Sequence, residues 1–171
     1  MKGCTKLAEF GRRQFLRGGA AVAAGAIAAA PAKAAPPGAG MAYPANRLAN
    51  LKDLKVNEPL PITYPDAESP GVLIRLGTPA PGGAGPDRDV VAYSTLCPHR
   101  GHALVHNAAD RTLNCPAHFS RFDCEMEGQQ VWGHATQNLP MFRLTVGANG
   151  DIAAVGVDEL IYGRTRNVLE G

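Results

Sequence analysis

Residues 97–120 read CPHRGHALVHNAADRTLNCPAHFS and hold two of the chain's four cysteines and four of its five histidines. The stretch contains two half-sites: C-x-H at Cys97 and His99, and C-x-x-H at Cys115 and His118. Thiolates and imidazoles are ligands both for zinc and for iron–sulfur clusters. The stretch therefore predicts a metal centre, and the fold has to bring these two half-sites together.

The distribution of ligands over the two half-sites favours a two-iron cluster. Zinc half-sites usually pair like ligands, whereas here each half-site supplies one cysteine and one histidine. That arrangement suits a Rieske-type [2Fe–2S] centre, in which one iron takes two thiolates and the other takes two imidazoles. A Cys₂His₂ zinc site, or no metal at all, remains as the alternative.

The residues next to the ligands support a cluster site. Pro98 and Pro116 each follow a cysteine and stiffen the two loops, and Gly101 gives the backbone freedom near the ligands. Ser120 lies two residues after His118, so its hydroxyl is expected to donate a hydrogen bond to a cluster sulfur.

The pattern outside this stretch predicts an all-β fold. The chain of 171 residues contains 20 Gly and 14 Pro, and apolar residues make up 45%, enough for one domain with a core. Short alternating or β-branched runs separated by turn residues predict antiparallel strands in a sandwich or small barrel. The predicted strands are 56–64 (an edge strand, because of its prolines), 71–77, 90–95, 128–133, 141–146 and 151–157, with a loop at 78–89.

The ligand motifs and their surroundings resemble the Rieske family. CPH, then CPAHFSRFD after 15 residues, then GHATQNLP match the family's C-x-H, C-P-x-H-x-S-x-F-D and G-x-x-x-x-x-L-P. The resemblance implies an all-β Rieske fold of three antiparallel sheets over residues 47–171, with a base domain and a cluster-binding subdomain at about 94–136. It also implies one [2Fe–2S] cluster held by Cys97, His99, Cys115 and His118.

Three positions depart from Rieske proteins of the cytochrome bc type. A disulfide joins the two loops in those proteins, but His102 and Ala117 stand at its positions here. Phe122 stands where those proteins have a tyrosine that donates to a cysteine sulfur. Because fewer hydrogen bonds to sulfur lower the potential, we expect a value below the cytochrome bc type, near the middle of the Rieske range of about −150 to +300 mV.

The N-terminal 34 residues are typical of an export signal. Arg12 and Arg13 precede an apolar run at 20–30 and an A-x-A site that ends at Ala34, which indicates a twin-arginine signal peptide; an ordinary secretory signal or an uncleaved anchor is the alternative. This segment holds six of the 17 basic residues and one of the 15 acidic residues, so the remainder carries a net charge of −3. We expect a periplasmic protein with an extended arm at 35–46, no stable membrane span after cleavage and no nucleic-acid partner.

The flanking segments ITYPDAESPG, LGTPAPGGAGPDRDVVAYSTLCPHRGH and AVGVDELIYGR are similar to the small subunits of arsenite oxidases. That resemblance implies an electron relay beside a large catalytic subunit, which carries a molybdopterin cofactor and a [3Fe–4S] cluster and oxidises arsenite to arsenate. The electron acceptor would be a soluble c-type cytochrome or a small copper protein, and this chain would hold no catalytic residue. A Rieske subunit of a quinol-oxidising cytochrome complex is the alternative, although such a subunit normally needs a membrane helix.

The remaining candidate residues are expected to have structural roles. Cys124 is expected to be a buried, inert thiol, and Trp132 to pack in the core, with a place at a partner interface as the alternative. His102 is expected to pack or to face solvent unless it shapes the cluster surface, and His106 and His134 are expected at the surface. The loop 78–89 and the arm are candidate docking surfaces, but their composition indicates only flexibility.

Overall fold

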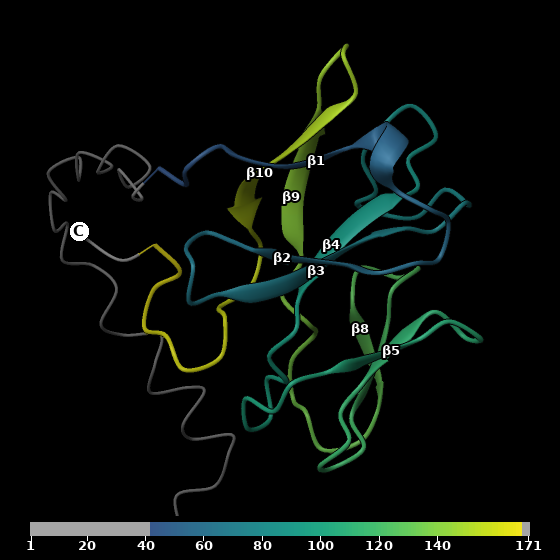
Figure 1. The fold of residues 1–171 in the computed structure, drawn as a ribbon. Coiled ribbons are helices and arrows are strands. Elements are labelled where there is room, and N and C mark those ends of the chain that lie inside the picture. The colour runs from purple at the N-terminus through teal and green to yellow at the C-terminus, as the bar shows by residue number, and fades with distance from the viewer. Residues whose placement is uncertain (1–41, 169–171) are drawn as a thin grey trace, which may run out of the picture. The chain divides into compact units, whose positions relative to one another are not determined.

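The computed structural model describes residues 42–168, which form three antiparallel sheets with a single 3₁₀ turn (Figure 1). The expected all-β class with three antiparallel sheets is therefore confirmed. The signal at 1–34 and the first part of the arm, up to residue 41, lie outside the described residues. Within 42–168 the structure contains no helix with the length and apolar character that a membrane crossing requires.

Two three-stranded sheets form the base of the molecule. The first has the order β1-β10-β9, with bounds Asn46–Asn50, Asp151–Val157 and Phe142–Val146. The second has the order β2-β3-β4, with bounds Leu60–Thr63, Pro70–Arg75 and Val90–Ser94. The 3₁₀ turn η1, Leu51–Asp53, follows β1 and is capped by the Asn50 side chain, which accepts a hydrogen bond from the Lys52 amide.

The base sheets pack closely because of their small and aromatic residues. Gly71 faces the Phe142 ring so tightly that a Cβ at this position would lie 2.4 Å from Phe142 Cε2. Tyr64 and Phe142 pack with their ring centroids 5.5 Å apart. This core fixes the orientation of β3 and β4, the strands that lead toward the ligand loops.

Strand β4 joins the base to the third sheet because both of its faces are buried. Val90 and Ala92 face the base core, whereas Val91 and Tyr93 face a second core that continues toward the ligand loops. The Tyr93 hydroxyl donates to the Cys124 carbonyl at 2.9 Å and so ties β4 to the third sheet. The strand ends three residues before Cys97, so the first ligand loop leaves from the most buried strand of the base.

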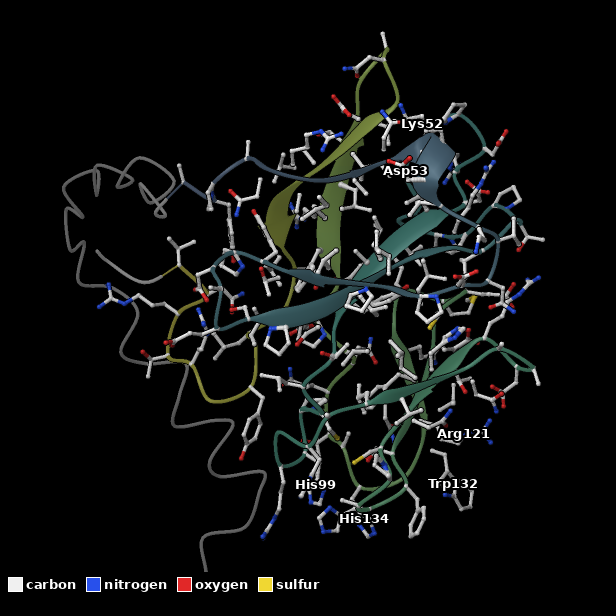
Figure 2. The ribbon with its side chains drawn as sticks, viewed as in Figure 1. Lys52, Asp53, His99, Arg121, Trp132 and His134 are labelled. Atoms are coloured by element: carbon white, nitrogen blue, oxygen red, sulfur yellow. The ribbon has the colours of Figure 1, made fainter. Side chains whose placement is uncertain are left out.

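The third sheet has the order β5-β6-β7-β8. In the sequence, β5 and β6 lie between the two half-sites, and β7 and β8 follow the second half-site. Its strands are short, with bounds Val105–Asn107, Thr112–Asn114, Arg121–Asp123 and Gln129–Trp132. Figure 2 shows Lys52 and Asp53 at the opposite end of the described domain from His99, Trp132 and His134. The base and the ligand loops therefore occupy opposite ends.

All six strands predicted from pattern are present, five of them with shifted bounds. The predicted edge strand at 56–64 is β2, which does lie at a sheet edge but begins at Leu60. The structure adds β1, which begins at Asn46 where the arm was expected to end, and the three-residue strands β5, β6 and β7. Three residues are too few to display a period of two, so the pattern gave no signal for them.

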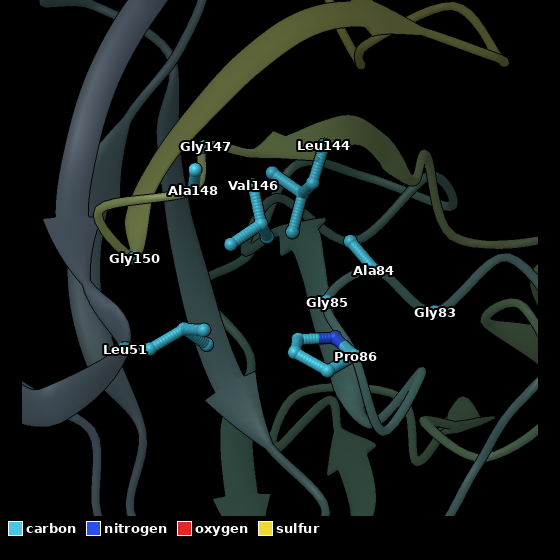
Figure 3. A pocket seen from close by; sticks show the side chains of 10 residues that line it. All are labelled: Leu51, Gly83, Ala84, Gly85, Pro86, Leu144, Val146, Gly147, Ala148 and Gly150. Carbon is cyan, nitrogen blue, oxygen red and sulfur yellow. The ribbon is translucent and has the colours of Figure 1, made fainter.

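A surface pocket in the base lies between η1, the loop before β4 and the turn between β9 and β10 (Figure 3). Its volume is about 520 Å³. Its lining carries no charged side chain and consists of Leu51, Gly83, Ala84, Gly85, Pro86, Leu144, Val146, Gly147, Ala148 and Gly150.

Candidate metal centre

The two half-sites form loops that are structural copies of each other. In the first loop, the Gly101 amide donates to the Cys97 carbonyl at 2.7 Å, and the Cys97 amide donates to the His102 carbonyl at 2.9 Å. In the second loop the same two bonds join Cys115 to Phe119 (3.0 Å) and to Ser120 (2.8 Å). Both loops therefore fold back on their cysteine in the same way, although their ligand spacings differ.

Both loops need a left-handed residue at the fourth position after the cysteine. In the first loop this residue is Gly101, with φ of 69°, which glycine adopts without strain. In the second loop it is Phe119, with φ of 61°, a conformation that costs a side-chain-bearing residue about 1–2 kcal/mol. Phe119 is also 70% exposed, so burial of its ring within this chain does not offset that cost.

The structure brings the four predicted ligands together. Cys97 and Cys115 are buried, and the ring centroids of His99 and His118 lie 4.7 Å apart. Burial raises the pKa of the Cys97 thiol most, and a hydrogen bond with the neighbouring Cys115 thiol raises it further. The backbone amides of His99 and Arg100 point at the Cys97 sulfur and act in the opposite direction, since they favour the thiolate that binds metal.

The free nitrogen atoms of the two histidines fit a metal centre. Nδ1 of His99 and Nδ1 of His118 are both buried, and neither has a hydrogen-bond partner. Buried polar atoms are normally paired, so two orphaned nitrogens beside two thiols indicate that a metal completes their coordination. Burial, followed by the charge of the nearby His118 imidazole, lowers the pKa of His99, which favours the neutral ligating form.

The donor set fits a two-iron cluster better than a single ion. Within residues 42–168, no three His, Cys, Asp or Glu side chains are arranged around one point as a single-ion site requires. A [2Fe–2S] cluster takes only two protein ligands at each iron. Two thiols and two imidazole nitrogens from paired loops meet that requirement.

Ser120 lies behind the second loop with its hydroxyl oxygen already occupied. Its Oγ accepts hydrogen bonds from the His134 amide at 3.1 Å and the Ala135 amide at 3.0 Å, and the side chain is fully buried. The hydroxyl proton is then left to donate elsewhere. A Cβ at Gly133 would lie 2.4 Å from the Ser120 Cα, so the loop 133–136 packs directly on the second ligand loop.

Two further histidines lie beside the ligands. The His134 ring stacks on His99 with a centroid separation of 5.6 Å, and the His102 ring lies 5.5 Å from His118. Both are exposed; the sequence had placed His102 at a disulfide position next to the ligands, but it gave no sign of the contact between His134 and His99. His106 was expected at the surface, whereas its Nε2 is buried without a hydrogen-bond partner, and burial lowers its pKa.

Trp132 corrects another expectation. It was expected in the core, but it lies at the end of an edge strand and is 67% exposed. Together with Phe119, Arg121, Asn114 and Cys115 it lines a pocket of about 350 Å³ next to the second loop. A regular alternation of apolar and polar residues would have predicted that Trp132 faces solvent. The preceding residues QQV show no such alternation.

Cys124 has the buried environment that its sequence context predicted. It is 1% exposed, and burial raises its pKa to about 12, so the thiol is inert. Cys97, Cys115 and Cys124 are all free thiols in the described part of the chain. The two ligand loops are therefore not joined by a disulfide, as the residues at 102 and 117 predicted.

Comparison with known proteins identifies the family of the chain. The profile of the Rieske [2Fe-2S] domain matches residues 46–143. The chain belongs to the Rieske family. It accordingly binds a [2Fe–2S] cluster, and the donor set described above fits that cofactor. When bound, a Rieske cluster accepts and releases one electron.

Two relatives match this Rieske chain over most of its length. It is 40% identical over 159 residues to the iodate reductase subunit IdrB of Denitromonas iodatirespirans, covering 91% of this chain and 85% of the relative. It is also 40% identical over 156 residues to the corresponding subunit of Pseudomonas sp. strain SCT, covering 89% and 81%.

Among solved structures, the soluble domain of Rieske protein II (soxF) from Sulfolobus acidocaldarius shares the fold. The TM-score is 0.62 at 23% identity, covering 73% of this chain and 85% of that one. This solved structure and the family match agree on a Rieske fold, and the two relatives are subunits of iodate reductases.

Proposed function

We propose that this chain is the exported electron-transfer subunit of a larger oxidoreductase, with its cluster held by Cys97, His99, Cys115 and His118. The observation that carries the proposal is the 40% identity to iodate reductase subunits over 91% of the chain. The ligand geometry supports it, since two buried thiols and two orphaned imidazole nitrogens converge at one end of the described domain.

The residues around the ligands suit a relay rather than a catalyst. Cys97 and Cys115 are shielded, whereas His99 and His118 are half-buried and lie near the surface of the domain. A partner that docks at this end would therefore approach the histidine side of the site. Catalysis belongs to a separate large subunit, which we propose carries molybdopterin and a [3Fe–4S] cluster.

Two substrates are candidates for that large subunit, and they require opposite directions of electron flow. Iodate is favoured by the relatives that match nearly the whole chain, and its reduction consumes electrons delivered through this subunit. Arsenite is favoured by the segments ITYPDAESPG and AVGVDELIYGR that flank the site, and its oxidation supplies electrons to this subunit. The soluble partner on the other side is proposed to be a c-type cytochrome or a small copper protein.

The second ligand loop offers the contact surface for one of these partners. Phe119 and Trp132 are large, exposed and next to each other in the lining of one pocket. No Asp or Glu occurs within 97–103, 115–121 or 131–138, whereas Arg100 and Arg121 do. Arg121 pairs with Asp110, and Arg100 is exposed. Aromatic and arginine side chains are those most enriched in binding hot spots.

The function is tested by purifying the complex from its native host through a tag on this chain. We expect a larger subunit to copurify, and we expect iodate to re-oxidise the reduced cluster in the complex but not in the isolated chain. Bleaching of the oxidised cluster by arsenite would establish the second candidate instead. A chain that purifies alone, with a cluster that neither compound affects, would contradict both.

Export is tested by the N-terminal residue of the protein recovered from the periplasm. We expect the sequence to begin near Ala35, after the A-x-A site. A protein that retains its N-terminus and sediments with membranes would favour the anchored subunit of a quinol-oxidising complex.

A further inference from the structure

The C-terminal strap, residues 158–168, follows β10 and is fastened to the base at both ends. At its start, the Asp158 carboxylate accepts a hydrogen bond from the Met141 amide at 2.7 Å. Near its end, Arg164 donates two hydrogen bonds to Asp66, at 2.6 and 2.8 Å. The strap is therefore an ordered part of the fold, and Figure 1 shows it in yellow near the end of the domain that holds the ligand loops.

Internal contacts fix the shape of the strap between these two attachments. The Asn167 side chain accepts a hydrogen bond from the Ile161 amide at 2.8 Å and donates to the Glu159 carbonyl at 2.8 Å and to the Tyr43 hydroxyl at 3.0 Å. Ile161 is 1% exposed and packs in the base core. These contacts fix the backbone at Ile161, and they therefore also fix the position of the next residue, Tyr162.

The Tyr162 ring lies against the first ligand loop. A Cβ at Gly101 would lie 2.5 Å from Tyr162 Cε1 and 2.6 Å from Cδ1, so the ring covers the α-carbon of that glycine. The Gln137 side chain also donates to the Leu160 carbonyl at 3.2 Å, which joins the strap to the loop that follows β8. The strap thus contacts the first ligand loop, at Gly101, and the loop that follows β8, at Gln137.

The two otherwise equivalent ligand loops differ at this position. The first loop has glycine at its left-handed residue and is covered by Tyr162 from a distant part of the chain. The second loop has Phe119 there, and that ring is exposed. Glycine leaves the backbone its greatest freedom, so the first loop is the one that needs an external restraint.

We propose that Tyr162 is a positioning residue for the cluster, which holds the Cys97–His102 turn closed by covering Gly101. The restraint acts on the first ligand loop, and no disulfide among the described cysteines ties that loop to the second. The proposal rests on the ligand assignment above, but the contact between Tyr162 and Gly101 exists whichever substrate the complex uses. Without the ring, the Gly101–Cys97 hydrogen bond opens more often, and the iron that Cys97 would hold becomes more accessible to chelators.

The test compares Tyr162→Ala, Tyr162→Phe and Leu160→Ala in the full chain. Leu160 is the matched control because its side chain is exposed on the same strap and only its carbonyl bonds Gln137. We expect the Gly101 and Cys97 amides of Tyr162→Ala to exchange about tenfold faster, and its cluster to be lost to a chelator about tenfold faster, as removal of one aromatic contact implies. Tyr162→Phe and Leu160→Ala should match the parent in both rates.

Amides in β3 serve as the internal reference for overall destabilisation. The proposal is overturned if Tyr162→Ala leaves the Gly101 and Cys97 amides unchanged, or if it accelerates them no more than the β3 amides. Amide hydrogen exchange is measured both with and without the cluster. The exchange comparison therefore remains valid even if the four ligands are assigned wrongly.

A double-mutant cycle isolates the contact itself. Gly101→Ala introduces both a left-handed alanine and a clash with the Tyr162 ring, whereas in the Tyr162→Ala background only the first cost remains. We expect Gly101→Ala to accelerate cluster loss by a smaller factor in that background. Equal factors in the two backgrounds would show that the Tyr162 ring does not lie against Gly101, and the proposed restraint would then be ruled out.

Discussion

Phe119 occupies a backbone conformation that favours glycine, and its ring is mostly in solvent. Both Phe119→Ala and Phe119→Gly remove the ring, but only glycine relieves the left-handed strain. We expect Phe119→Gly to be more stable than Phe119→Ala by about 1 kcal/mol, measured by chemical denaturation. Equal stabilities would mean that the second ligand loop is not strained at this position.

Trp132 tests the proposed partner surface. Trp132→Ala removes an exposed side chain, so stability and the cluster spectrum should be unchanged, whereas a hot-spot contact would weaken partner binding about 10- to 30-fold. Binding is measured by titrating the purified partner. Val155→Ala, an exposed change on β10 of the base, is the control and should bind as the parent does. Unchanged affinity of Trp132→Ala for the partner would show that this surface does not bind it.

Ser120 is expected to affect both the reduction potential of the cluster and the packing of the second ligand loop. We expect Ser120→Ala to lower the reduction potential, since it would remove the hydrogen bond that we propose the hydroxyl donates to a cluster sulfur, and to destabilise the fold by about 1–3 kcal/mol, since two buried amides lose their acceptor. A redox titration measures the first effect and chemical denaturation the second. Loss of stability with no change of potential would show that the hydroxyl does not reach the cluster.

At the scale of elements, the attachment of the C-terminal strap depends on the charge of Asp66. The hydrogen bond from Arg164 is the main cause of a lowered pKa at Asp66, and Ser69 and the Glu68 amide add to it. A lowered pKa in the folded state stabilises the fold above the unfolded pKa of about 3.9, and that contribution is lost as the pH falls through the folded value.

We therefore expect Asp66→Asn to be less stable than the parent at neutral pH, with a gap that narrows as the pH falls below about 4. Chemical denaturation of both proteins at a series of pH values measures the gap. Arg164 stays charged throughout, so the change belongs to Asp66. A gap of constant size across the series would contradict this role of the carboxylate.

Sequence pattern predicted every described strand except β1 and the three-residue strands β5, β6 and β7, and the three-residue strands were missed for a physical reason. Strands β3, β4, β9 and β10 bury one or both faces, and their apolar residues reveal them. Strands β5 to β7 have three residues each and are stabilised by pairing beside the ligand loops, a tertiary effect that local pattern does not contain. The strap was missed because several contacts that hold it join residues far apart in the sequence, such as Tyr162 with Gly101 and Asn167 with Tyr43.

At the scale of the whole molecule, the proposed ligand set rests on local sequence. Two short motifs contain the four proposed ligands, and the structure places His99 beside His118 and Cys97 beside Cys115. The surroundings of the ligands were not predictable in the same way. Neither the stacking of His134 on His99 nor the exposure of Trp132 follows from residue type, since both depend on how the third sheet packs on the base.

The base and the ligand loops have different roles in the described domain. The two base sheets supply one buried core, and β4 carries the fold into a second core that includes Cys97 and Cys115. This arrangement places the metal centre at one end, with an exposed aromatic surface beside it and a strap that braces its more flexible loop.

The central claim is that Cys97, His99, Cys115 and His118 hold a Rieske [2Fe–2S] cluster. The most direct measurement is the EPR spectrum of the reduced full chain beside those of His99→Ala, His118→Ala and Cys124→Ala. We predict a mixed-valence [2Fe–2S] signal in the parent, the same signal in Cys124→Ala, and its loss or replacement in both histidine variants. A parent without the signal, or a histidine variant with the parent spectrum, would contradict the account.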